Sequence, residues 1–199
     1  MLVYIRYTVD YLSNVAGIMK RILIVDSSFR WGGINVALQN LLRYIDSDLV
    51  QVDLFVMVHS GNYENEISNC RLLPKNFLID CLMDHVYMKR GLIKIIAVCI
   101  KLINKVTGAT FQHWLYGVVG NKLVSRNEYD AVIGWHEGAP TIFVSHIKHR
   151  NKIAWVHCNY ANYSEKPSEL KYYSTFQSIV NVAKSIKPLT EAMFPDCAK

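Results

Sequence analysis

The chain has 199 residues, of which 51% are hydrophobic and only 19% are charged. This composition is typical of a folded globular protein and excludes an intrinsically disordered one. The net charge is +6, which favours anionic partners such as nucleotide phosphates, lipid pyrophosphates, a membrane surface or nucleic acid without choosing among them. The length suits one domain with a sizeable core.

The first 18 residues contain Arg6 and Asp10 but no long apolar run. They therefore indicate neither a signal peptide nor a transmembrane helix. We expect Met19 to be the natural start and residues 1–18 to be a mis-assigned or poorly ordered extension, with a short amino-terminal helix as the alternative. Residues 19–199 are expected to form a single domain.

Residues 20–45 predict a buried strand, a glycine-containing loop and an amphipathic helix in succession. The apolar run Ile22–Val25 is typical of a central parallel strand that is covered on both faces. The segment Ser27–Gly33 follows as a loop, and apolar residues then recur at helical spacing. Because Gly32 and Gly33 lie where the helix begins, their backbone amides are predicted to bind phosphate or sugar oxygens. A tight turn without a ligand is the alternative.

A second strand is predicted at Val52–Val58, and a short third strand near Arg71–Ile79, around Pro74. Two further apolar segments, Ala131–Gly134 and Ile153–Val156, are also typical of strands. Helical segments alternate with these strands. The sequence therefore predicts an α/β fold, with one Rossmann-like domain whose mainly parallel sheet is flanked by helices.

Between residues 84 and 126 the sequence predicts two helices without an intervening strand. In the first of them, Lys94, Lys101 and Lys105 fall within one sector, and most other positions are apolar. A basic amphipathic helix of this kind can lie in a membrane interface, with its lysines among anionic headgroups. We expect instead a helix that packs on the core and keeps its lysines in water, and the membrane interface is the alternative. The lysines argue against a transmembrane span.

The five cysteines are scattered and form no C-x-x-C pair, as expected of reduced thiols in a cytosolic protein. His146 and His149 lie close in sequence, beside Lys148 and Arg150. We interpret them as part of a solvated basic surface, and we predict neither a metal site nor a cofactor. Nucleic-acid binding is not predicted, because the basic residues are dispersed rather than interleaved with aromatic residues on one face.

Ligands of open parallel sheets bind outside the carboxyl ends of the strands. The loops predicted at that edge offer backbone amides, imidazoles, a carboxylate, an amide and a phenol. These groups belong to Gly32, Gly33, His136, Glu137, His157, Asn159 and Tyr160. Such groups suit a saccharide or a phosphate, because imidazole donates to hydroxyl or phosphate oxygens and a carboxylate accepts from hydroxyl groups. For His157, a structural residue that caps its loop is the alternative.

Several of these segments resemble the amino-terminal domain of GT-B glycosyltransferases of family four. The first strand, the Gly-Gly loop and the helix with Asn40-Leu41-Leu42 resemble the opening unit of that domain. YDAVIGWHEGAPT at residues 129–141 resembles a later strand and loop. KIAWVHCNY at residues 152–160 resembles a strand that ends in Trp-x-His, and residues 172–195 resemble the stretch where the domain ends. The resemblance extends from Met19 to the carboxyl terminus and is specific as a set.

The resemblance implies the amino-terminal half of a GT-B fold and a glycosyltransferase of the hexosyltransferase type, most members of which are retaining. Such an enzyme would transfer a sugar from a nucleotide-sugar donor to a glycan or lipid-linked acceptor in surface polysaccharide synthesis. The resemblance places the acceptor in this domain, the glycine loop near the donor diphosphate, and His157 near the reaction centre as the catalytic candidate.

In the same family the donor nucleotide is held chiefly by a carboxyl-terminal domain with a pair of glutamates, and neither is recognised in this sequence. We therefore expect the isolated chain to be inactive without a donor-domain polypeptide. We expect a cytoplasmic location, with peripheral membrane contact through Lys94, Lys101 and Lys105 if the first interpretation of their helix holds.

Two positions depart from the pattern of the family. Asn35 stands where an acidic residue often follows the Gly-Gly pair, and Ala183 replaces the serine of a Val-Ser element.

A non-catalytic acceptor-binding or partner-binding module is the alternative function. A dinucleotide-dependent oxidoreductase is not predicted, because no G-x-G-x-x-G motif follows the first strand.

Overall fold

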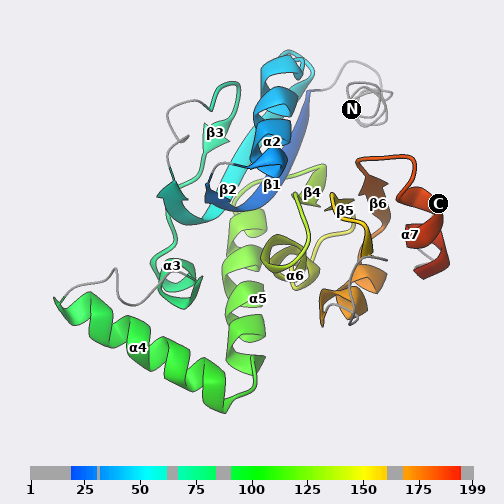
Figure 1. Ribbon diagram of the computed structural model, residues 1–199. Coiled ribbons are helices and arrows are strands. Elements are labelled where there is room, and N and C mark those ends of the chain that lie inside the picture. The colour runs from blue at the N-terminus through cyan, green and yellow to red at the C-terminus, as the bar shows by residue number, and fades with distance from the viewer. Residues whose placement is uncertain (1–18, 31, 62–66, 84–90, 161–167, 194–199) are drawn as a thin grey trace.

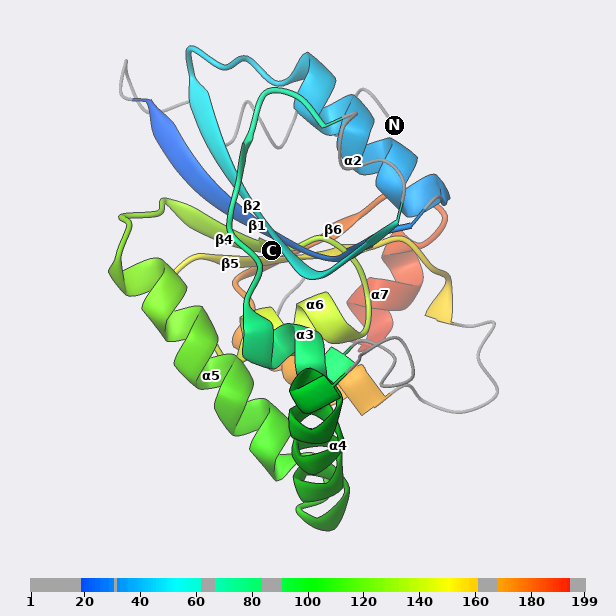
Figure 2. The same cartoon turned by 90° about the vertical axis from the view of Figure 1, so that its left-hand side faces the viewer.

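The computed structural model describes residues 19–30, 32–61, 67–83, 91–160 and 168–193, and all structural statements refer to these residues. The predicted extension at residues 1–18 lies outside them, so the assignment of Met19 as the natural start stays a prediction. Figures 1 and 2 show one twisted sheet with helices on both of its faces.

The sheet has six strands in the order β3-β2-β1-β4-β5-β6, and all of its neighbouring strands are parallel. The strands are β1 (Lys20–Phe29), β2 (Val50–Gly61), β3 (Arg71–Leu72), β4 (Ala131–Gly134), β5 (Lys152–Val156) and β6 (Ser178–Asn181). This arrangement confirms the predicted Rossmann-like α/β domain. The strand order reverses between β1 and β4, and this boundary is the topological switch point of the sheet.

Helices cover both faces of the sheet. They are α2 (Gly33–Tyr44), α3 (Phe77–Met83), α4 (Gly91–Val106), α5 (Thr110–Ser125), α6 (Ala139–Ser145), the 3₁₀ helix η4 (Ser168–Thr175) and α7 (Lys187–Met193). Figure 2 shows α2 on one face and α3, α5 and α6 on the other, with α4 extending away from the body. None of the helices in the described part of the chain is both long and apolar enough to span a bilayer.

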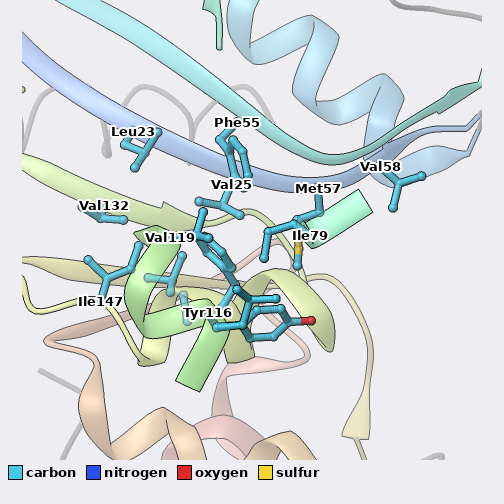
Figure 3. Packing of buried hydrophobic residues seen from close by; sticks show 14 of the residues in the cluster. Leu23, Val25, Phe55, Met57, Val58, Ile79, Tyr116, Val119, Val132 and Ile147 are labelled. Carbon is cyan, nitrogen blue, oxygen red and sulfur yellow. The ribbon is translucent and has the colours of Figure 1, made fainter. Parts of the chain in front are cut away.

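The core has two apolar layers, one on each face of the sheet. Ile22 and Ile24 of β1 belong to the layer beneath α2, whereas Leu23 and Val25 belong to the layer against α5 and α6. Figure 3 shows the second layer, where Tyr116 of α5 faces the strands. Successive residues of β1 therefore enter different layers, which explains why the strand is an unbroken apolar run.

The first strand is longer than predicted. It includes Ser27 and Ser28 and ends at Phe29, because β1 stays paired with β2 as far as Gly61. The prediction that a loop begins at Ser27 is therefore wrong. The extra residues matter for the site, because they carry the end of β1 past the last residue that pairs with β4.

The third strand is much shorter than predicted, since β3 contains only Arg71 and Leu72. The side chain of Asn76 accepts hydrogen bonds from the amides of Leu78 and Ile79 at 3.1 Å each, and α3 begins at Phe77. An asparagine that satisfies the first amides of a helix is a typical amino-terminal cap. This local signal makes the strand prediction wrong for most of residues 71–79.

At the amino edge of the sheet, a buried carboxylate joins the first three strands. Asp53 of β2 accepts from Arg71 at 2.8 and 2.6 Å, from Arg21 at 3.0 Å and from the Tyr129 hydroxyl at 2.6 Å. Burial by itself raises the pKa of the Asp53 carboxyl, but these donors outweigh it and hold the pKa below its ordinary value. The cluster is therefore a structural feature, at the edge opposite the predicted ligand site.

We expect Asp53→Asn to lower the free energy of unfolding by about 3 kcal/mol at neutral pH, because two arginines lose a buried counter-charge. The lowered pKa of Asp53 means that its stabilising contribution is present above the ordinary carboxyl range and is lost as the pH falls through the folded-state pKa. Urea unfolding curves of wild type and variant should therefore converge in strong acid. The exposed Asp48→Asn is the control, and equal destabilisation by both variants would contradict the prediction.

Candidate functional site

The candidate site lies where β1 and β4 separate. The two strands pair from Ile22 with Ala131 to Val25 with Gly134, and the Trp135 amide then donates to the Val25 carbonyl at 3.0 Å. Beyond this point β1 continues beside β2, whereas the chain after β4 turns toward α6. Polar residues at the end of β1 are therefore placed at the switch point, where open α/β sheets bind their ligands.

A buried carboxylate and a histidine meet across this gap between the strands. Asp26 of β1 is completely buried, and its Oδ1 lies 3.2 Å from Nε2 of His136. The Oγ atom of Ser27 is 3.0 Å from the same nitrogen. Nδ1 of His136 lies 2.7 Å from the Glu137 carbonyl oxygen, which can only accept, so Nδ1 carries a hydrogen.

Burial lowers the pKa of His136, but the hydrogen bond and the charge of Asp26 outweigh it, and the pKa is raised above the ordinary value of 6.5. The environment therefore favours the imidazolium form of His136. Both of its ring nitrogens are engaged within the protein. This side chain is suited to hold the ends of β1 and β4 together, rather than to exchange protons with a ligand.

Two features shape the loop that carries His136. Gly138 has φ 79°, a conformation that favours glycine, and it caps the start of α6. The hydroxyl of Thr141 in α6 donates to the His136 carbonyl at 2.8 Å. A Cβ atom on Gly134 would come within 3.2 Å of the Thr141 Cα, so this glycine allows α6 to cross close over the end of β4. The loop is thus fixed by its own sequence.

Glu137 connects the loop after β4 with the loop after β5. One of its carboxylate oxygens, Oε1, accepts hydrogen bonds from the backbone amides of both His157 and Cys158. These amides follow the last residue of β5, where the strand no longer supplies partners. Glu137 is therefore a positioning residue that fixes the backbone of His157.

His157 has the opposite electrostatic setting to His136. Its Nε2 lies 2.9 Å from the carbonyl oxygen of Trp135, which can only accept, so the hydrogen of the neutral ring is on Nε2. Burial lowers the pKa of His157 below the ordinary value, although the nearby Glu137 carboxylate opposes this, and the charge of His136 adds to the lowering. The neutral ring is therefore favoured.

A neutral ring with its hydrogen on Nε2 has a lone pair on Nδ1. No described residue is a hydrogen-bond partner of this Nδ1 atom. A histidine in this state can accept a hydrogen bond from a hydroxyl group and can act as a general base. Of the two histidines at this edge, His157 is thus the one whose chemistry is open to a ligand.

The start of α2 belongs to the same edge, because the indole of Trp135 donates to the carbonyl of Ile34 at 3.1 Å. Gly32 caps α2 without a side-chain hydrogen bond, and the first turn contains no acidic residue. A Cβ atom at Gly32 or Gly33 would meet no atom within 4 Å, so the space around these backbone atoms is open. Uncapped amides in open space at a helix start suit a phosphate.

The conformation of Gly32 does not require glycine, since its φ of 170° is extended backbone that other residues also adopt. The role predicted for Gly32 and Gly33, a close approach of the backbone to a ligand, thus depends on the open space rather than on the backbone angles. Asn35, which stands where the resembling sequences often have an acidic residue, donates instead to the carbonyls of Ser28 and Arg30. It fixes the chain that leads from β1 into α2.

The structure brings His136, Glu137 and His157 together by direct contacts and links them to the start of α2 through Trp135. Asn159 is half-buried on the loop after β5. Tyr160 is buried, and its hydroxyl lies 2.6 Å from that of Tyr173 in η4. The side chain of Tyr160 therefore packs in the core, and we leave it out of the site.

Asp26 and Ser27 are the site residues that the sequence analysis missed. The available signal was the position of Asp26 directly after four apolar strand residues. A carboxylate at the end of a covered strand must find a partner, since a buried and unpaired charge is very costly. The search for that partner leads to the end of the neighbouring strand, and so to His136.

The interpretation of His146 and His149 as a solvated surface is wrong, because both are half-buried. Nδ1 of His146 lies 2.8 Å from the Ile142 carbonyl oxygen, and its ring stacks on His113 with 4.8 Å between centroids. The ring nitrogens of His149 lie 3.0 and 2.9 Å from the carbonyl oxygens of Asn151 and Tyr129. These histidines satisfy backbone groups at helix and loop ends.

Within the described residues, no three His, Cys, Asp or Glu side chains are grouped as a metal site would need. Comparison of the chain with known protein families, with characterised proteins and with solved structures found no match in any of the three. We define the switch-point site as Asp26, Ser27, His136, Glu137 and His157 with the start of α2.

We expect Asp26→Asn to lower the pKa of His136, because burial still penalises the imidazolium while the largest interaction that favours it, the hydrogen bond and charge of Asp26, is weakened. An NMR titration of the histidine Cε1 protons measures this shift. The His149 signal serves as the internal control of folding, because this residue lies at the opposite edge of the sheet. An unchanged titration of His136 would show that Asp26 does not hold its proton.

Proposed function

We propose that this domain is the acceptor-side, amino-terminal part of a glycosyltransferase and that it binds a glycan or lipid-linked acceptor at the switch-point site. The observation that carries the proposal is the neutral His157 with an open Nδ1, which Trp135 links to the uncapped start of α2. An acceptor offers a hydroxyl group to such a nitrogen, and a nucleotide-sugar donor offers phosphates to such a helix start.

In the proposed reaction the acceptor oxygen bonds to the anomeric carbon of the donor sugar, and the bond from that carbon to the nucleotide diphosphate breaks. Nδ1 of His157 accepts the hydrogen bond of the attacking hydroxyl group, orients it and takes up its proton as the new bond forms, while the diphosphate leaves with the electron pair of the broken bond. Glu137 fixes the backbone of His157, and the pair of Asp26 and His136 fixes the loop that carries Glu137. The assignment to a retaining hexosyltransferase of surface polysaccharide synthesis comes from the sequence resemblance.

A donor-binding domain, on this or another polypeptide, is part of the proposal. Transfer of a sugar requires that both substrates are held in one geometry and that water is excluded. The described residues form one sheet with one switch point, which suits one of the two substrates. We place this activity in the cytoplasm, as the scattered cysteines of the sequence suggest.

A non-catalytic acceptor-binding module is the second candidate. It is favoured by the engagement of most polar groups at the site, since His136 uses both ring nitrogens and Glu137 uses Oε1 within the protein. In that case Nδ1 of His157 only binds the acceptor. The two candidates differ in their kinetics after a donor domain is added, because only the first requires His157 for turnover of bound acceptor.

We expect His157→Gln to weaken binding of a saccharide by about tenfold, because the glutamine NH2 group can keep the bond to the Trp135 carbonyl but its acceptor oxygen does not occupy the position of Nδ1. Saturation-transfer NMR with a panel of mono- and oligosaccharides identifies the ligand and measures its affinity. Thermal unfolding of the same preparation separates this effect from a loss of folded protein.

The matched control is His149→Gln, the same change at the opposite edge of the sheet, which should leave the affinity per folded molecule unchanged. The proposal is contradicted if no saccharide of the panel binds wild-type protein. It is equally contradicted if both glutamine variants bind as the wild type does.

We expect the purified chain of 199 residues to transfer no sugar by itself, because one wall of the proposed two-domain cleft is absent from the reaction mixture. The measurement is release of nucleoside diphosphate from a nucleotide sugar in the presence of the saccharide that binds. Turnover above that of the buffer alone would overturn the requirement for a donor domain, although it would leave the acceptor site intact.

A further inference from the structure

The exposed large apolar side chains of the described residues gather mainly on α3, α4 and α5. On α4 only Ala97 and Ile100 are buried. Seven other apolar side chains of this helix are between 45% and 78% exposed: Leu92, Ile93, Ile95, Val98, Leu102, Ile103 and Val106. The interpretation of α4 as a helix that packs its apolar residues on the core is therefore wrong for most of them.

The exposed residues form a face of their own. At about 100° per residue, Ile95, Leu102 and Val106 lie on the side of α4 opposite Ala97 and Ile100. Figures 1 and 2 show α4 at the periphery of the molecule, beside α3 and α5. A helix on the surface of a water-soluble domain normally directs polar residues outward. This helix directs apolar residues outward as well as inward.

Positive charge borders this face. Lys94, Lys101 and Lys105 lie in one row along its flank, and the sequence contains no aspartate or glutamate from Gly91 to Asn127. The neighbouring helix α5 adds Trp114, which is 60% exposed and stacks on Phe111 with 5.8 Å between ring centroids. Apolar residues, an exposed tryptophan and a row of lysines are the composition of helices that lie in a membrane interface.

We propose that the outer face of α4, together with Trp114 of α5, docks on an anionic lipid surface. In this arrangement the outward apolar residues enter the boundary of the acyl chains, and the lysine row lies among the headgroups. The proposal goes beyond the proposed function and does not depend on it, because it uses neither the sheet edge nor His157.

Charge favours a lipid surface over a second copy of this chain. A twofold dimer through the outer face of α4 would bring two rows of lysines together, and no acidic residue of α4 or α5 would neutralise them. Like charges that face each other oppose association. An anionic membrane attracts Lys94 and Lys105 instead, and each lysine near such a surface strengthens binding by about fivefold.

The test uses the full chain with phosphatidylcholine vesicles, with and without phosphatidylglycerol. We expect wild-type protein to sediment with the vesicles that contain phosphatidylglycerol and to stay in the supernatant with phosphatidylcholine alone. Binding should shift the tryptophan emission to shorter wavelength in a Trp31→Phe background, and Trp114→Phe should remove this shift, because the other two tryptophans, Trp135 and Trp155, are buried.

Two pairs of variants separate the contributions. Ile95→Ser with Leu102→Ser should weaken vesicle binding by more than about tenfold, since two large side chains no longer leave water. The control for this loss is Tyr44→Ser with Leu49→Ser, at two side chains that are 63% and 40% exposed elsewhere on the molecule. These controls should bind vesicles as the wild type does.

The charge pair is Lys94→Glu with Lys105→Glu, which should weaken binding by at least about tenfold. Its matched control, Arg43→Glu with Lys184→Glu, removes the same charge at exposed positions on other elements and should retain most of the binding. Thermal unfolding confirms that each variant is folded.

The proposal is overturned if wild-type protein binds neither kind of vesicle or binds both equally. It is also overturned if analytical ultracentrifugation shows a dimer that Ile95→Ser with Leu102→Ser dissociates, because the face then belongs to a second copy. Saccharide binding measured without vesicles should be the same in all of these variants. The membrane proposal and the proposed function can therefore fail separately.

Discussion

The burial of the Asp26 carboxylate is the constraint on which the rest of the site depends. A carboxylate without access to water needs a partner of opposite charge or a set of donors, and His136 supplies it from the end of the neighbouring strand. This pairing fixes the loop after β4, where the turn at Gly138 leads into α6. Glu137 in that loop then binds the amides that follow β5. One buried charge thus determines how three strand ends are arranged.

The same arrangement separates the roles of two histidines. His136 is next to a carboxylate and is favoured in its charged form, whereas His157 binds a carbonyl and is favoured in its neutral form. The charge on His136 itself helps to keep His157 neutral. A fixed cation beside a neutral, open imidazole is a suitable setting for a hydroxyl ligand, and the start of α2 adds amides for a phosphate. The proposed acceptor site follows from these features together.

The central strands could be predicted from the sequence, because an apolar run such as Ile22–Val25 is compatible with few structures other than a buried strand. The boundary between β3 and α3 could not, because it is set by hydrogen bonds from the amides of Leu78 and Ile79 to the Asn76 side chain. His136, Glu137 and His157 were predicted to lie at one edge of the sheet, because the carboxyl ends of parallel strands share an edge. The sequence did not predict that His136 pairs with Asp26 and Ser27, because this contact depends on how far β1 extends past its last pair with β4. For α4, helical spacing showed which residues share a face but not which face meets the body.

The most direct test of this account is the protonation state of the two histidines, read from the ring ¹⁵N chemical shifts in a long-range ¹H–¹⁵N spectrum at neutral pH. The account predicts that His157 is neutral with its hydrogen on Nε2, and that Nδ1 shifts when the saccharide binds. It predicts that both nitrogens of His136 carry hydrogen. A charged His157, or a neutral one with its hydrogen on Nδ1, would contradict the account.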